Sequence, residues 1–189
     1  MGVLNASTAR RRLATAALLL GCVAFRAGPA VAAPTTADVE AVFLFNFSQF
    51  VEWPAQSFPD SSSPIVIGVL GSDPFGAALD DVVRGEMVKG RPLVVRRSQH
   101  VEQLTDCHIL FVSRSERSRL EPIVQLLKGR SILTVSDLEG FASEGGVIGF
   151  ILVDNKIRLR VNLEAAHAAG LTLSSKLLRP AQIVGATGQ

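Results

Sequence analysis

The sequence predicts an α/β fold: a single compact domain with a mainly parallel sheet flanked by helices, followed by a C-terminal β-hairpin and short helices. Two observations lead to this prediction. Short, continuously apolar segments alternate with helical ones from Ile65 onward, and strict polar/apolar alternation is confined to the last third of the chain. The length of 189 residues, less a leader described next, suits one hydrophobic core.

The first 32 residues have the pattern of a secretory signal peptide. Three arginines at positions 10–12 precede an apolar run over residues 13–25, and a tail of small residues ends at Ala32. We therefore expect an exported domain over residues 33–189. An alternative for the leader is a lipoprotein signal, because LLGC resembles a lipobox in which Cys22 would carry the lipid anchor.

Loss of the leader changes the charge and the cysteine content. It removes four arginines and no acid, so Lys plus Arg falls from 19 to 15 against 17 Asp plus Glu, a net charge of about −2. Nothing then draws the protein to nucleic acid or anionic lipid. Only Cys107 remains, which excludes an internal disulfide. We expect Cys107 to be a small buried hydrophobic residue, with His108 on the opposite face of the strand.

Residues 41–54, AVFLFNFSQFVEWP, hold four of the ten phenylalanines and the only tryptophan. The spacing of Val39, Phe43, Phe47 and Phe50 predicts a helix that buries this stripe, with Asp38 near its start and Pro54 as its end. Two interpretations stay open, a fully buried core helix and a subunit or partner contact. Under the second, a contact surface includes the side chains Phe45, Phe50 and Trp53.

The middle of the chain alternates strands with helices. Continuous apolar character predicts strands covered on both faces at Ile65–Leu70, Leu93–Arg97, Ile109–Ser113 and Ile132–Val135. Helices are expected between them at Phe75–Val83, Val101–Leu104 and Glu116–Leu127, the last begun by the capping box Ser113–Glu116. This order is typical of a parallel sheet with crossover helices.

The last third of the chain predicts a β-hairpin. Residues 147–153 and 156–162 flank the turn residues Asp154 and Asn155, and the second strand alternates apolar side chains with Arg158, Arg160 and Asn162 on a solvent-exposed face. Short helices follow over residues 163–169 and 173–178.

One candidate ligand pocket combines two segments. The turn containing Gly71, Ser72 and Asp73 runs from a strand into a helix, where free backbone N–H groups hold anions in other proteins, and Arg158 and Arg160 would add positive charge. Simpler explanations stay open, because Ser72 or Asp73 before Pro74 is a helix N-cap and exposed strands ordinarily carry charges.

We find no catalytic set and no metal site in the sequence. The three histidines, His100, His108 and His167, are far apart and lack ligand spacing, and the serine motifs of acyl-transfer enzymes are missing. The sequence therefore predicts a protein that is not an enzyme and uses no cofactor.

Four segments taken together resemble the YfiR family of small periplasmic proteins. They are FNFSQFVEWP, PIVIGVLGSDPFG, CHILFVSRSE and the long C-terminal stretch from ILTVSDLEGF to LLRPAQIV. The resemblance extends over about residues 37–184 and depends on the order and spacing of the segments behind an export signal.

The resemblance implies a non-enzymatic repressor. It would bind the periplasmic region of an inner-membrane diguanylate cyclase or sensor protein, lower cyclic-di-GMP synthesis, restrain biofilm formation and form a homodimer. Redox control through disulfides, which the resemblance also implies, conflicts with the single cysteine, Cys107. The alternative function is a periplasmic small-molecule-binding sensor that uses the Gly71–Asp73 turn with Arg158 and Arg160 as its pocket.

Overall fold

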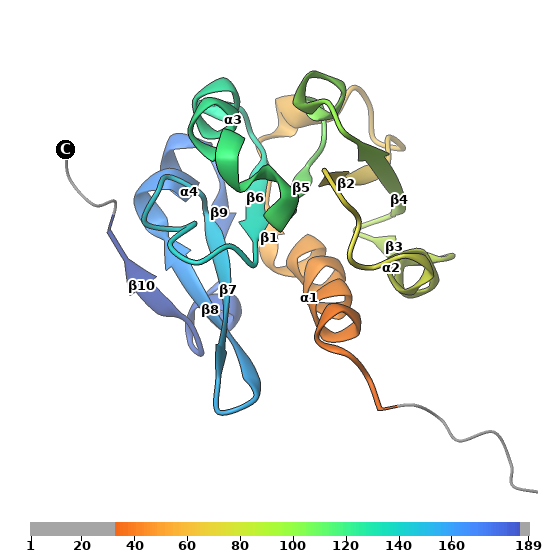
Figure 1. Cartoon of the computed structure of the whole chain (residues 1–189). Helices are drawn as coiled ribbons and strands as arrows, with labels where there is room; N and C mark the ends of the chain where they lie inside the picture. The colour runs from red at the N-terminus through yellow and green to blue at the C-terminus, as the bar shows by residue number, and fades with distance from the viewer. Residues whose placement is uncertain (1–32, 186–189) are drawn as a thin grey trace, which may run out of the picture. The chain divides into compact units, whose positions relative to one another are not determined.

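The computed structural model describes residues 33–185, so the predicted signal peptide and Cys22 lie outside the described residues. Its centre is a mixed, mainly parallel sheet of eight strands (Figure 1). In chain order these are β2 (Ile65–Leu70), β3 (Met87–Val88), β4 (Arg91–Ser98), β5 (Ile109–Val112), β6 (Leu133–Ser136), β7 (Ile148–Val153), β8 (Lys156–Asn162) and β10 (Gln182–Val184). They lie in the order β10-β8-β7-β6-β5-β2-β4-β3. The α/β prediction is confirmed.

The five strands β4, β2, β5, β6 and β7 are parallel, while β8 returns antiparallel beside β7 and β3 pairs antiparallel with β4. Every residue of β2, β5 and β6 is buried, as continuous apolar runs in a doubly covered sheet require. The fourth predicted strand, Leu93–Arg97, lies within β4, but most of its residues are not buried, so the prediction of cover on both faces is wrong there.

Helices cover both faces of the sheet. The first core contains side chains of α1 (Thr36–Phe50), α2 (Ala77–Val83), α4 (Leu163–Ala168) and α5 (Ser175–Leu178), packed on strand residues such as Ile67. The second contains α3 (Leu120–Leu127) and the 3-10 helix η2 (Val101–Leu104), packed on alternate strand residues such as Leu110. Figure 1 shows α1 and α2 on one side of the strands and α3 on the other.

The aromatic helix α1 differs from its prediction at both its buried face and its end. Thr35 caps it in a reciprocal capping box with Asp38. Glu40 and Leu44 point inward, whereas Val39 is 37% exposed, so the predicted stripe is wrong there. Because the helix is apolar almost all round, its contacts with α2, α5 and β8 decide which side is buried.

The helix ends at Phe50 and not at Pro54. Residues Val51–Glu52 form β1, which pairs antiparallel with β9 (Thr172–Leu173) in a separate two-stranded sheet. Pro54 instead precedes the 3-10 helix η1 (Ala55–Ser57). Pairing with a strand more than 100 residues away, which local sequence does not reveal, sets this boundary.

The β7–β8 hairpin is confirmed, with Asp154 and Asn155 both at positive φ as a type I′ turn requires. Asn162 departs from the predicted exposed face. It is buried, its Nδ2 donates to the Ala142 carbonyl at 2.8 Å, and its Oδ1 caps α4 by accepting from the Ala165 N–H. Asn162, the last residue of β8, therefore has a structural role as the N-cap of α4.

Candidate functional site

The carboxyl ends of β2 and β5 form the topological switch point of the sheet. The chain leaves β2 towards β4 on one side and leaves β5 towards β6 on the other. Crevices at such points are the usual ligand sites of open α/β sheets. Gly71, Ser72 and Asp73 follow β2 directly, so the predicted anion-binding turn lies at this position.

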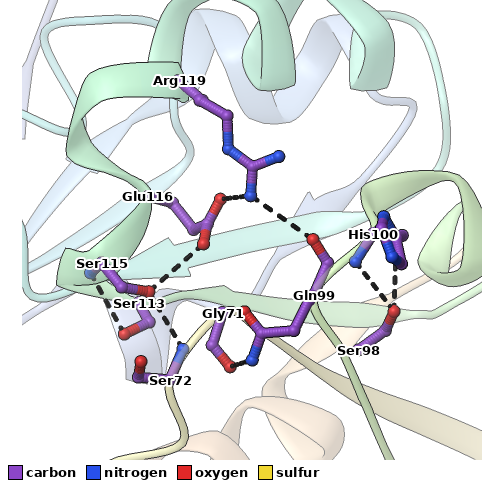
Figure 2. Close-up of polar contacts among 9 residues, drawn as sticks. All are labelled: Gly71, Ser72, Ser98, Gln99, His100, Ser113, Ser115, Glu116 and Arg119. Carbon is purple, nitrogen blue, oxygen red and sulfur yellow. Dashed lines mark hydrogen bonds and ion pairs between the residues drawn. The ribbon is translucent and has the colours of Figure 1, made fainter.

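The chain's own side chains fill the switch point (Figure 2). The Ser72 N–H donates to Ser115 Oγ at 2.9 Å, and the Gly71 N–H donates to the Ser98 carbonyl at 2.9 Å. Gln99 Nε2 donates to the Gly71 carbonyl at 3.0 Å. These bonds use the backbone donors that an anion would need.

Glu116 closes the same corner from η3 (Arg114–Arg119). It is 2% exposed, yet its carboxylate is fully satisfied, because Arg119 Nη2 pairs with one oxygen and Ser115 Oγ bonds the other at 3.2 Å. Gly71 is required here: a Cβ at that position would lie 2.3 Å from Ser115 Oγ. The corner is a structural plug.

Asp73 also has a structural role. Its Oδ1 accepts from the Phe75 N–H at 2.8 Å, and its Oδ2 pairs with Arg97 Nε at 2.6 Å. Helix α2 begins only at Ala77 with Gly76 as its cap, so the predicted N-cap at Ser72 or Asp73 is replaced by a local turn. Arg97, which sequence analysis did not single out, also pairs with Asp80 and holds the turn to β4.

The other half of the predicted pocket lies elsewhere. Arg158 and Arg160 are on β8, and β7, β6 and β5 separate that strand from β2. At about 4.8 Å per strand, the two segments are about 19 Å apart. Arg160 Nε donates to Gln182 Oε1 of the neighbouring β10 at 3.2 Å. The structure does not bring the two halves of the predicted pocket together.

The predicted contact residues occupy two different settings. Phe45 and Phe50 are half-buried on α1 and flank its outward face, where Val39 and Val42 are 37% and 44% exposed. Trp53 lies beyond the helix, half-buried, and its Nε1 donates to the His108 carbonyl at 3.1 Å. Phe45 and Phe50 thus border an exposed stripe in which Val39 and Val42 lie beside the polar Asn46 and Gln49, whereas Trp53 anchors the η1 segment to the sheet.

Cys107 and His108 point to opposite sides, as predicted. Cys107 lies in the second core, and burial raises the pKa of its thiol to about 11. The His108 ring accepts from the Val66 N–H at Nδ1, contacts the Ser57 carbonyl at Nε2 and stacks on Phe58. Burial lowers the pKa of this imidazole. Both residues serve the packing.

A second polar feature, which sequence analysis missed, lies between α1 and the β7–β8 hairpin. We call it the acidic pocket: Glu40 of α1, Asp137 after β6 and Arg114 after β5, beside a cavity of about 360 Å³. Arg114 Nε pairs with Asp137 Oδ2 at 2.7 Å. Burial, with Asp137 nearby, raises the pKa of Glu40 from 4.5 to about 7, and burial also raises the pKa of Asp137.

The only sequence signal for this pocket is Glu40, an acid flanked by apolar residues and placed after the capping turn of α1. Its partners, Arg114 at the start of η3 and Asp137 after β6, lie 74 and 97 residues further on, a distance in sequence that no local pattern reveals. Within residues 33–185, no group of three His, Cys, Asp or Glu side chains is arranged to hold a metal ion. In that same range, each helix is too short or too polar to cross a membrane.

A family model, DUF4154, described as YfiR/HmsC-like, matches residues 37–182, which is most of the described domain. The search of curated proteins found no match. The match agrees with the resemblance seen in the four sequence segments and extends through both cores and the hairpin. This chain belongs to the YfiR/HmsC-like family.

Proposed function

We propose that the protein is a periplasmic, non-enzymatic regulator that binds a membrane-bound signalling protein, a diguanylate cyclase, and represses it. The observation that carries this proposal is the YfiR/HmsC-like family match over residues 37–182. It covers the sheet from β2 to β8 together with α1. The side chains of this protein fill the switch point, where α/β enzymes usually bind their substrates, and this suits a binding protein better than an enzyme.

The docking surface in this proposal is the outward face of α1. Val39 and Val42 are exposed there, and the half-buried rings of Phe45 and Phe50 border them. Exposed apolar side chains beside aromatic ones are typical of association surfaces. Trp53 contributes indirectly, by holding the end of this segment against His108. The family resemblance also implies a homodimer, which is part of this proposal.

Repression would follow from differential affinity. A regulator that binds the inactive state of a cyclase more tightly than the active state raises the inactive population, and its release restores synthesis. About 1.4 kcal/mol of differential affinity changes the ratio of the two states tenfold.

The test measures cyclic-di-GMP in cells that lack the gene. We expect a higher level than in the parent strain, restored to normal by the full chain and not by a chain without residues 1–32. Cyclic-di-GMP that is unchanged by the deletion would reject repression, and restoration by the leaderless chain would reject the periplasmic location.

A matched pair of variants tests the surface. Val42→Glu places a charge in the exposed stripe and should abolish complementation, while Met87→Glu, at a 57% exposed position on β3, should complement normally. Both sites are exposed, so neither change should unfold the protein. Equal complementation by the two variants would move the contact away from α1.

The second candidate function is a periplasmic small-molecule-binding sensor. The acidic pocket favours it, since its cavity of about 360 Å³ is within the range of small-ligand sites and contains buried charged groups. The two functions are compatible, because a repressor can respond to a ligand.

A further inference from the structure

The acidic pocket lies at the carboxyl edge of the sheet and borders the plugged switch point, because Pro74 of the turn after β2 and Arg114 after β5 line it. The N-terminal half of α1 forms one wall, the β7–β8 hairpin forms another, and the loops after β5 and β6 close it. Phe150 and Ile157 supply apolar lining, and Glu40, Asp137 and Arg114 supply charge. Contacts between α1 and β8 hold these walls together.

The two carboxylates of this pocket are only partly satisfied by the described residues. Glu40 is 4% exposed, and within residues 33–185 its carboxylate forms no hydrogen bond and no ion pair shorter than 4 Å. Asp137 Oδ1 is buried and has no hydrogen-bond partner within the same described range. Arg114 is the one cation at the pocket, and it pairs with the other Asp137 oxygen, Oδ2. Two acids therefore share one guanidinium.

Glu116 is the internal comparison. It is as buried as Glu40, but Arg119 and Ser115 satisfy both of its oxygens. The fold thus provides partners for a buried acid whose role is structural. Glu40 faces a cavity and a second acid instead, an arrangement that a purely structural role does not require.

The carboxylates of Glu40 and Asp137 determine which ligand would be complementary to the pocket. They are hydrogen-bond acceptors with negative charge, enclosed by apolar walls, and an ammonium group offers three donors and one positive charge in a compact volume. Hard divalent cations prefer six or more oxygen ligands, more than two carboxylates supply. An aliphatic or aromatic tail would contact Phe150 and Ile157.

We propose that the acidic pocket binds a small organic amine, whose ammonium group donates hydrogen bonds to Glu40 and lies beside the negative charge of Asp137, while its hydrocarbon part packs on the hairpin. This inference does not rest on the proposed repression. The exposed residues Val42 and Leu152 belong to α1 and β7, which also line the pocket. A bound amine would therefore contact the same elements that border the proposed docking surface.

The experiment is a calorimetric titration of the purified protein with n-pentylamine hydrochloride at about pH 8, beside the neutral shape match 1-pentanol. We expect the amine to bind and the alcohol to bind at least about tenfold more weakly, because the charge-assisted bonds are lost. Glu40→Gln and Asp137→Asn should each weaken amine binding about tenfold or more. Asp81→Asn, an exposed change on α2, should leave it unaltered.

Three results would overturn the proposal: no binding of the amine to the wild type, equal binding of 1-pentanol, or unchanged amine affinity in Glu40→Gln and Asp137→Asn. Both variants keep nearly the shape of the original side chain. A thermal unfolding measurement before the titration serves as the control that each variant is folded. The titration does not measure cyclic-di-GMP. A failure of the amine to bind therefore leaves the proposed repression intact, and a failure of the cyclic-di-GMP test leaves the proposed amine site intact.

Discussion

Replacement of Glu40 by glutamine should stabilise the protein, and the gain should depend on pH. The carboxyl is buried without a hydrogen bond from residues 33–185, and its pKa rises from 4.5 to about 7. The folded state therefore binds this proton more tightly than the unfolded state, so stability falls as pH rises from about 4.5 to about 7. A tenfold change in proton affinity corresponds to about 1.4 kcal/mol, which makes the cost roughly 3 kcal/mol above pH 7.

Glutamine has nearly the same shape and carries no charge, so it removes this cost. We expect Glu40→Gln to match the wild type near pH 4.5 and to exceed it by roughly 3 kcal/mol near pH 8. Urea unfolding followed by the fluorescence of Trp53, the only tryptophan, measures both values. Glu121→Gln on the exposed side of α3 is the control and should change neither.

A stability gain that is the same at both pH values would show that shape or helix propensity, and not the buried charge, accounts for it. A loss of stability at pH 8 would contradict the reasoning directly, because it would mean that the Glu40 carboxylate has a favourable partner. Either result would also weaken the case for an amine in the acidic pocket.

Three further outcomes are expected. Gly71→Ala should destabilise the fold by about 2–4 kcal/mol in urea unfolding, since its Cβ would meet Ser115 at positive φ, whereas Gly85→Ala, at positive φ in open space, should cost about 1 kcal/mol. Native Cys107 should resist alkylation near neutral pH and react once urea unfolds the protein, because burial raises its pKa to about 11; rapid native alkylation would revive redox control. An NMR titration should give His108 a pKa below 6.5, so that its contribution to stability is present above that pH and is lost as pH falls; a value above 6.5 would contradict its buried, neutral role.

The sequence determined the strands, the hairpin and the family. The runs at Ile65–Leu70 and Ile109–Val112 are apolar at every position, which only a doubly covered strand explains, and Asp154-Asn155 specifies the turn of the hairpin. These are local signals, carried by neighbouring residues through propensity and period.

Tertiary structure alone decided the helix face, the helix end and the site. Glu40 faces inward because packing selects the buried side of a helix that carries apolar residues on several sides, and α1 stops at Phe50 because Val51 pairs with Leu173. The acidic pocket joins residues 40, 114 and 137, and the predicted pocket fails because three strands separate β2 from β8. Such contacts depend on strand order and on burial in three dimensions, and neither leaves a periodic trace along the chain.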